Sequence, residues 1–353
     1  MLRHHGDVDA VPGLLDFAVN VRGDGPPDWL RDRLAAALDR LGRYPSATDD
    51  AATRAVVAAR HGRDPDEVLV LGGVAEGFAL LPALLPASAP GCAAVVHPSF
   101  TEPEVALRRA GIPVHRVLTD GAHRLRPERV PPEADLVVLG NPTNPTSVLH
   151  PADLVRSLAR RGRVLVVDEA FADAVPGEPE SLAADRQTPG LLVLRSLTKT
   201  WGLPGLRAGY ALGAPGLLAR LARPRPPWPV SSLVLEAVRV CCAPAAVAQA
   251  RSAAVQVAGH RDWMARRLGE LPGVTVHQPA AAPFLLLHVP AGERVRAALR
   301  DDSGIAVRRA DTFPGLTSDH LRVAVRPSEL AARLVAGLRG ALARPALTTR
   351  VTT

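Results

Sequence analysis

The sequence contains Val164-Leu165-Val166-Val167-Asp168-Glu169, an apolar run rich in valine that ends in two carboxylates. Similar short runs recur between residues 68 and 212, and segments of helical period, such as 102–111 and 152–161, separate them. This alternation is typical of β-α-β units, which form a mostly parallel sheet. The sequence therefore predicts an α/β fold with a doubly wound, seven-stranded sheet, with strands at 68–71, 93–97, 114–118, 136–139, 164–167, 191–194 and 207–212.

A proline-rich stretch at 222–230 separates this region from the rest of the chain. Because proline fixes φ and has no backbone N–H, the stretch predicts neither a helix nor a central strand. Beyond it, a helical pattern at 234–268 leads to apolar runs at 284–289 and 321–325 and to a closing helical pattern at 328–343. We therefore expect three parts: an N-terminal arm over 1–25 that joins the smaller domain and the active site, a large domain over 26–230, and a smaller α+β domain over 231–353.

The composition of the chain excludes several classes of protein. Its 353 residues include 42 lysines and arginines and 35 acidic residues, and the net charge is +7. The arginines alternate with Asp and Glu, and no basic run predicts binding to nucleic acid. No apolar run approaches the ~20 residues of a membrane-spanning helix, and the start is too polar for a signal peptide, so we expect a cytoplasmic protein without a membrane partner. The three cysteines have neither a disulfide nor a metal-ligand spacing, so we expect no metal.

Lys199 is the only lysine in the chain. A guanidinium stays protonated, whereas a desolvated amine can lose its proton and attack a carbonyl. The hydroxyl residues Ser196 and Thr198 precede this lysine and Arg207 follows it, and such groups can bind a phosphate. These neighbours favour a Schiff-base lysine in a site for a phosphorylated aldehyde cofactor. The alternative is that one lysine has survived by chance in a chain rich in arginine.

Other candidate residues follow predicted strands, where ligands bind in sheets of this kind. Gly72 and Gly73 open a helix whose free N–H groups favour a phosphate, although such glycines often serve only the turn. Phe100 can stack on a flat ring or belong to the core. Asn144 lies in an Asn-Pro loop, which is either an ordinary turn or a rigid holder for a phenolic oxygen. Asp168 needs a cationic partner such as a protonated pyridine nitrogen, unless it caps a helix or binds a metal.

The order of these motifs along the chain resembles that of fold-type I pyridoxal-phosphate (PLP) enzymes of the aminotransferase superfamily, over nearly the whole length. The resemblance implies that Lys199 binds the cofactor aldehyde and that Asp168 pairs with the pyridine nitrogen. It implies that Asn144 binds the ring oxygen, that Phe100 stacks on the ring, and that Tyr44 reaches the neighbouring phosphate in a homodimer. The phosphate ligands implied within one chain are the Ala75 and Glu76 backbone, Ser196, Thr198 and Arg207.

Further segments resemble the branch that contains threonine-phosphate decarboxylase of cobalamin biosynthesis and histidinol-phosphate aminotransferase. Phe171, where many transaminases have a tyrosine, and the pair Arg308 and Arg322 favour the decarboxylase within this branch. A surface position is the alternative for Arg308, Arg309 and Arg326. The segments that resemble this branch are His5-Gly6, 16–20, 228–231, 307–316 and 321–326. The resemblance implies that a small anionic amino-acid phosphate is held by His5, Gly6, Asn20, Asn144, Arg308 and Arg322.

We therefore expect a PLP-dependent lyase that decarboxylates L-threonine O-3-phosphate. The alternative is an aminotransferase of the histidinol-phosphate type, which passes the amino group to 2-oxoglutarate. The two reactions differ in which substrate bond stands perpendicular to the cofactor ring, and a sequence shows no such orientation. A second alternative is a protein of this fold without catalysis, which the presence of Lys199, Asp168, Asn144 and Arg207 disfavours.

Overall fold

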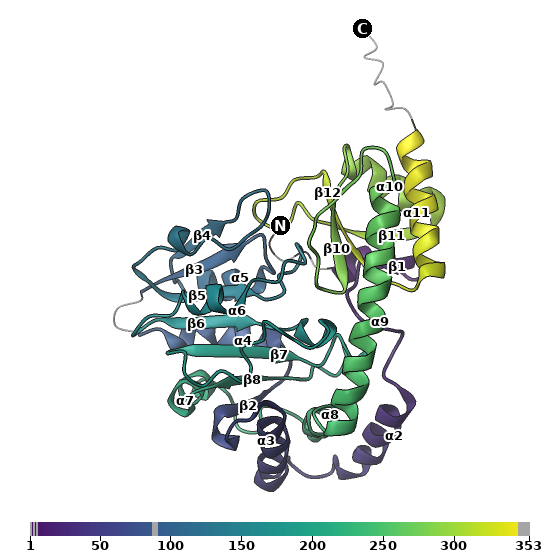
Figure 1. Cartoon of the computed structure of the whole chain (residues 1–353). Coiled ribbons are helices and arrows are strands. Elements are labelled where there is room, and N and C mark those ends of the chain that lie inside the picture. Colours follow the sequence, from purple (N-terminus) through teal and green to yellow (C-terminus); the bar gives the residue numbers. More distant parts are fainter. Residues whose placement is uncertain (1, 3, 5, 87–90, 345–353) are drawn as a thin grey trace.

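The computed structural model describes residues 2, 4, 6–86 and 91–344, which form two sheets connected by a long helix (Figure 1). All neighbours in the larger sheet are parallel except the pairs that include the strand at Gly209–Gly213. This arrangement confirms the predicted fold class, and each predicted strand is present. The order in the sheet is β2 (Val68–Leu71), β8 (Gly209–Gly213), β7 (Leu191–Ser196), β6 (Val164–Asp168), β5 (Ala134–Gly140), β3 (Cys92–His97) and β4 (Val114–Leu118).

Two layers of helices cover the faces of this sheet. Successive side chains of a strand point to opposite faces, so the apolar runs of β5, β6 and β7 supply both layers of the core. One layer contains α2 (Asp28–Ala37), α3 (Ala47–His61), α6 (Ala152–Arg156) and α8 (Ser232–Cys241), and it packs on Val137, Leu165 and Val193. The other contains α4 (Val74–Leu80), α5 (Glu102–Arg109) and α7 (Pro215–Ala222), and it packs on Leu136, Val166 and Leu192.

The smaller sheet combines an N-terminal strand with the C-terminal part of the chain (Figure 1). Its order is β1 (Leu15–Phe17), β11 (Ile305–Arg309), β12 (His320–Ala324), β10 (Phe284–His288) and β9 (Thr275–Val276). The pair β1 and β11 is parallel, and the others are antiparallel. The helices that share its apolar core are α9 (Pro244–Gly269), α10 (Gly292–Ser303) and α11 (Ser328–Ala343).

The helical pattern predicted at 234–268 is two helices in the structure. Helix α8 ends at Cys241, and α9 begins at Pro244. Proline has no backbone N–H, so it is favoured in the first turn of a new helix and not inside a continuous one. The pattern at 152–161 is likewise shorter than predicted, because α6 ends at Arg156. Short helices complete the described chain: α1 (Gly6–Asp9) and one-turn 3₁₀ helices at Leu38–Arg40, Pro65–Glu67, Leu81–Leu84, Pro127–Arg129 and Ala172–Ala174.

In the described part of the chain, no helix by itself has the length and apolar character needed to cross a membrane. Helices α8 and α9 meet the same criterion only as a pair bent by 68°, by length and composition alone.

Candidate active site

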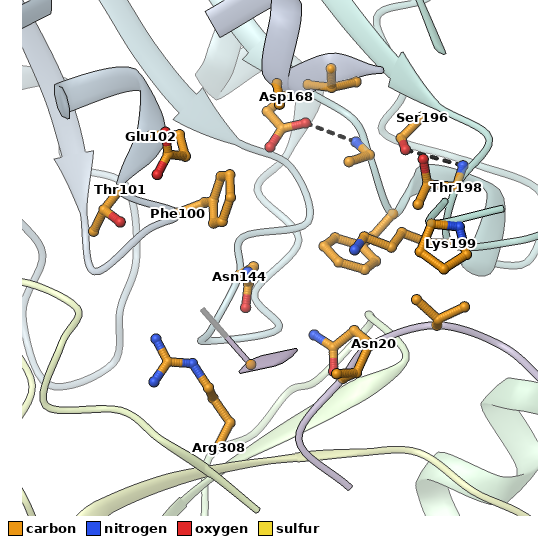
Figure 2. Close-up of a pocket in the computed structure, with 18 of the residues that line it drawn as sticks. Asn20, Phe100, Thr101, Glu102, Asn144, Asp168, Ser196, Thr198, Lys199 and Arg308 are labelled. Atoms are coloured by element: carbon orange, nitrogen blue, oxygen red, sulfur yellow. Dashed lines mark hydrogen bonds between the residues drawn. The ribbon is translucent and has the colours of Figure 1, made fainter. Parts of the chain in front are cut away.

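A cavity of about 720 Å³ lies between the two sheets, at the carboxyl ends of β6 and β7 (Figure 2). The larger sheet supplies one wall, and the segment 18–21 with strands β11 and β12 supplies the other. Most of the residues singled out in the sequence line this cavity: Gly6, Asn20, Ala75, Phe100, Asn144, Asp168, Ser196, Thr198, Lys199, Arg207, Arg308 and Arg322.

Three predicted residues are not placed in this cavity. His5 lies outside the described residues. Glu76 does not line the cavity, because its N–H donates to Gly73 O at 3.1 Å and its carboxylate accepts from Gly72 N at 2.6 Å. Tyr44 is 74% exposed and stacks on Trp228, with 4.3 Å between the ring centroids. Glu76 therefore braces the glycine turn, and Tyr44 is directed to solvent.

Asp168 ends β6 with its carboxylate toward the cavity (Figure 2). Its Oδ1 accepts a hydrogen bond from Ala170 N at 3.0 Å. Burial, with a smaller contribution from Glu169, raises the pKa of Asp168 to about 7, although Ala170 N–H and Lys199 act to lower it. Such a carboxylate is stabilised by a cation placed in the cavity, as the sequence predicted.

Lys199 follows the end of β7 and also lines the cavity (Figure 2). The turn before it is ordered by Thr198 N, which donates to Ser196 Oγ at 3.3 Å. Its own carbonyl accepts from Arg22 N at 3.0 Å, so the backbone of the lysine is joined to the N-terminal segment. The two hydroxyl side chains are buried beside it at the cavity wall.

Gly73 and Arg207 form a cradle beside these hydroxyls. Gly73 precedes α4 with φ +84°, and a Cβ there would lie 3.1 Å from Arg207 Nη2. Only glycine therefore lets the guanidinium approach the start of the helix. Arg207, Ala75, Ser196 and Thr198 together present a cation, a helix start and hydroxyls, which are groups that bind a phosphate.

The opposite wall presents two arginines that are direct partners across the antiparallel pair β11 and β12, so they share one face of the sheet. Arg322 donates to Asn144 Oδ1 at 2.8 Å and to Ala18 O. Arg308 donates to Thr312 Oγ1 at 2.7 Å and to His4 O at 2.6 Å. Burial lowers the pKa of Arg308 to about 10 and that of Arg322 to about 9.

The segment 16–21 passes over the cavity and is held by Arg326. The guanidinium donates to Asp16 O at 3.1 Å, Val19 O at 2.8 Å and Val21 O at 3.1 Å. Asn20, between the last two, has both side-chain amide atoms buried without a hydrogen-bond partner in the described structure. A buried amide in this position can bind a ligand or a water in the cavity. The sequence predicts no contact for Arg326, because three of its acceptors are backbone atoms about 300 positions away in the chain.

The residues present fit a phosphorylated pyridine cofactor. The carboxylate of Asp168 can pair with a ring nitrogen, and the Arg207 cradle can bind the phosphate. Phe100 lines the space with its ring 6.0 Å from that of Phe78, so it contacts both the cavity and the core. Lys199 supplies the amine.

The family model described as "Aminotransferase class I and II" matches residues 12–338. A protein of Mycobacterium tuberculosis named histidinol-phosphate aminotransferase is 54% identical, over 92% of this chain and 87% of that protein. A threonine-phosphate decarboxylase of Salmonella typhimurium is 33% identical, over 93% and 91%. The solved histidinol-phosphate aminotransferase of Clostridium acetobutylicum superposes with a TM-score of 0.84 at 20% identity, over 93% and 98%, which supports the fold alone.

These relatives overturn the expectation of a decarboxylase in cobalamin biosynthesis, because the more similar protein is named an aminotransferase. That expectation depended partly on Phe171. The structure shows that Phe171 lines the cavity and that its ring packs edge-on against Phe284, with 4.9 Å between the ring centroids. Fold, site and relatives agree: the chain belongs to the class I and II aminotransferases, enzymes of fold type I whose cofactor is pyridoxal phosphate.

Proposed function

We propose that the protein is an aminotransferase of the histidinol-phosphate type, which moves the amino group of a phosphorylated amine to 2-oxoglutarate. Similarity to a protein named histidinol-phosphate aminotransferase supports amino transfer over decarboxylation, and the pair Arg308 and Arg322 supports a phosphorylated substrate. Both arginines are buried at the cavity on one face of the smaller sheet. Within the described part of the chain, Arg322 donates to the neutral oxygens of Asn144 and Ala18, and Arg308 has the carboxylate of Asp9 at 3.5 Å. A phosphate monoester has about −1.5 to −2 charges at pH 7 and suits two such guanidiniums.

When bound, PLP supplies the aldehyde that accepts the amino group and the ring that withdraws electrons from the substrate carbon. Asp168 keeps the ring nitrogen protonated, because the charge pair stabilises both groups in a site shielded from bulk water. Asn144 Oδ1 is engaged by Arg322, so its Nδ2 remains to donate to the ring oxygen. Lys199 Nζ takes the proton from the substrate carbon as a general base and returns it as a general acid.

The test is a coupled assay with purified enzyme, L-histidinol phosphate and 2-oxoglutarate. We expect glutamate and the phosphorylated ketone in equal amounts, with no release of CO2. Release of CO2 from L-threonine O-3-phosphate, without formation of glutamate in the first assay, would contradict the proposal.

Removal of either buried arginine is expected to weaken the reaction with phosphorylated substrates. Arg322→Met should lower kcat/KM for histidinol phosphate on the order of 10²–10³-fold, since hydrogen bonds to a charged group contribute about 1.5–3 kcal/mol each. Arg308→Met should act in the same direction. Histidinol without its phosphate is the comparison substrate, and its kcat/KM should fall by at least about tenfold less, because loss of the contact with Asn144 affects both substrates equally. Equal losses for both substrates would show that the arginines do not bind the phosphate.

Arg326 is proposed as a positioning residue that holds Asn20 over the cavity. Arg326→Met should raise KM and lower kcat/KM by about 10–100-fold, which corresponds to roughly 1.4–2.7 kcal/mol. Arg326→Met should also reduce the hydrogen-exchange protection of residues 16–22. If Arg326 contributed only its charge to the site, this protection would not change. Arg309→Met is the matched control, because Arg309 pairs with Asp311 at 2.7 Å and makes none of these bonds. Unchanged protection of 16–22 in Arg326→Met would contradict this role.

A homodimer is proposed from the exposed apolar side chains near Tyr44. Leu38 and Leu41 are about half exposed, and the stacked rings of Tyr44 and Trp228 lie on the surface. Such a patch favours association with a second protein surface. We expect a dimer in analytical ultracentrifugation, and Tyr44→Ala should weaken PLP binding by about tenfold through loss of one phosphate hydrogen bond. A monomeric wild-type enzyme with full activity would contradict the proposal.

A further inference from the structure

Cys92, His115 and Glu133 come together at the edge of the larger sheet that is remote from the active site. Cys92 is the first residue of β3, His115 is the second of β4, and Glu133 directly precedes β5. These three strands are neighbours, with Cys92 opposite Ala134 and His115 opposite Ala94 (Figure 1). One ligand atom from each side chain, a thiol sulfur, a ring nitrogen and a carboxylate oxygen, lies within 4.8 Å of the other two.

We propose that Cys92, His115 and Glu133 form a Zn²⁺ site. A thiolate, an imidazole and a carboxylate are the ligand types that zinc prefers, whereas Mg²⁺ and Ca²⁺ take oxygen ligands alone. His115 and Glu133 are exposed, so small rotations can bring their donors to the roughly 2.0–2.3 Å of zinc bonds. Water completes a tetrahedral site with three protein ligands.

The backbone that carries these ligands is already fixed. Arg163 is buried and donates to the carbonyls on both sides of Glu133, with distances of 3.1 Å to Pro131 O, 3.1 Å to Pro132 O and 2.8 Å to Ala134 O. The ladder between β3 and β4 fixes the spacing of the other two residues. Zinc binding therefore needs no rearrangement of the main chain, which favours affinity.

The local charge is mixed, because Glu133 and Asp135 lie near Cys92 whereas Arg160 pairs with Asp135 at 3.8 Å. Zinc binding at Cys92 releases the thiol proton, and the charge of the bound ion stabilises the thiolate as a ligand.

The position of the site defines what the metal does. The cavity lies at the carboxyl ends of the parallel strands, whereas these ligands lie at the amino ends of β3, β4 and β5. A bound ion joins three adjacent strands at that edge without contact with cofactor or substrate. Its effect is on stability, because an ion that binds only the folded state stabilises it by mass action.

The test is a Zn²⁺ titration of the PLP-loaded enzyme by calorimetry. We expect one strong site per chain, and a raised melting temperature when it is filled. Cys92→Ser and Glu133→Gln should each raise the dissociation constant by at least about 100-fold, since loss of even an outer partner of a metal ligand costs roughly 10–100-fold. Glu133 is exposed, so Glu133→Gln keeps the test valid if Cys92→Ser folds poorly.

Two readouts identify the ligands. X-ray absorption of the zinc-loaded protein should show one sulfur at about 2.3 Å. Zn²⁺ should also slow the reaction of Cys92 with a disulfide reagent, since Cys241 and Cys242 are buried.

The matched control is His123→Ala, which removes a histidine elsewhere on the molecule whose ring packs edge-on against that of His277, with 4.8 Å between the centroids. This variant should bind zinc as the wild type does. Unchanged zinc affinity in Cys92→Ser would overturn the proposal, especially if His123→Ala lost it. An X-ray absorption spectrum without a sulfur ligand would overturn it as well.

Discussion

Lys199→Ala is expected to lower kcat by about 10⁴-fold, the upper end of what a positioned acid-base group contributes. Lys199 is the only lysine in the chain, so no other lysine can take its place. The variant should keep its fold and should still bind PLP through Asp168 and the Arg207 cradle. Lys199→Arg is the matched control for charge and length, and it should be equally inactive because a guanidinium does not release its proton.

The measurement combines turnover with chemical trapping. Borohydride should fix the cofactor to a single internal peptide of the wild-type enzyme, the one that contains residue 199. Lys199→Ala should give no such adduct. An adduct elsewhere in the variant, or turnover within about tenfold of the wild type, would contradict the assignment, because the acid-base contribution is about 10²-fold or more.

Asp168→Asn is expected to have opposite effects on stability and on function. In the cofactor-free protein, the folded pKa of about 7 lies above the value of 3.8 for an ordinary Asp, so ionisation of this group opposes folding. The penalty is absent below about pH 4, grows between about pH 4 and pH 7, and is complete above pH 7. The variant without cofactor should therefore be more stable than the wild type near pH 8, by about 2–4 kcal/mol.

Binding and catalysis should change in the other direction. Loss of the carboxylate removes the partner of the ring nitrogen, so PLP affinity and kcat/KM should each fall about 10²–10³-fold, since breaking a buried charge pair costs about 2–5 kcal/mol. Chemical denaturation of both cofactor-free proteins at several pH values measures the first effect, and cofactor titration measures the second. A stability difference that stays constant between pH 4 and pH 8 would refute the assigned pKa shift.

The strands of the larger sheet could be predicted from the sequence because each is an uninterrupted apolar run between turn signals. The rule that ligands bind beyond strand ends then located Asp168, Lys199 and Phe100 at the cavity. In contrast, β1 has three residues, and its pairing with β11 joins positions nearly 300 residues apart, so no local pattern predicts it. The break before Pro244 was missed because helical periodicity continues across it.

The part of the site contributed by the smaller sheet was predicted only through family resemblance. The hydrogen bonds from Arg322 to Asn144 Oδ1 and from Arg326 to Val19 O depend on tertiary packing. The choice between decarboxylation and amino transfer depends on the orientation of a substrate bond, which no residue pattern encodes. Comparison with relatives corrected that choice.

The parallel pairing of β1 with β11 has a consequence for how the enzyme is made. During synthesis, the complete larger sheet leaves the ribosome before residues 305–326, on which the wall formed by 16–21 depends. A translation product that ends before residue 305 therefore contains the amine of Lys199 but lacks the second wall of the cavity. The enzyme acquires its competence only after residues 305–326 have been synthesised.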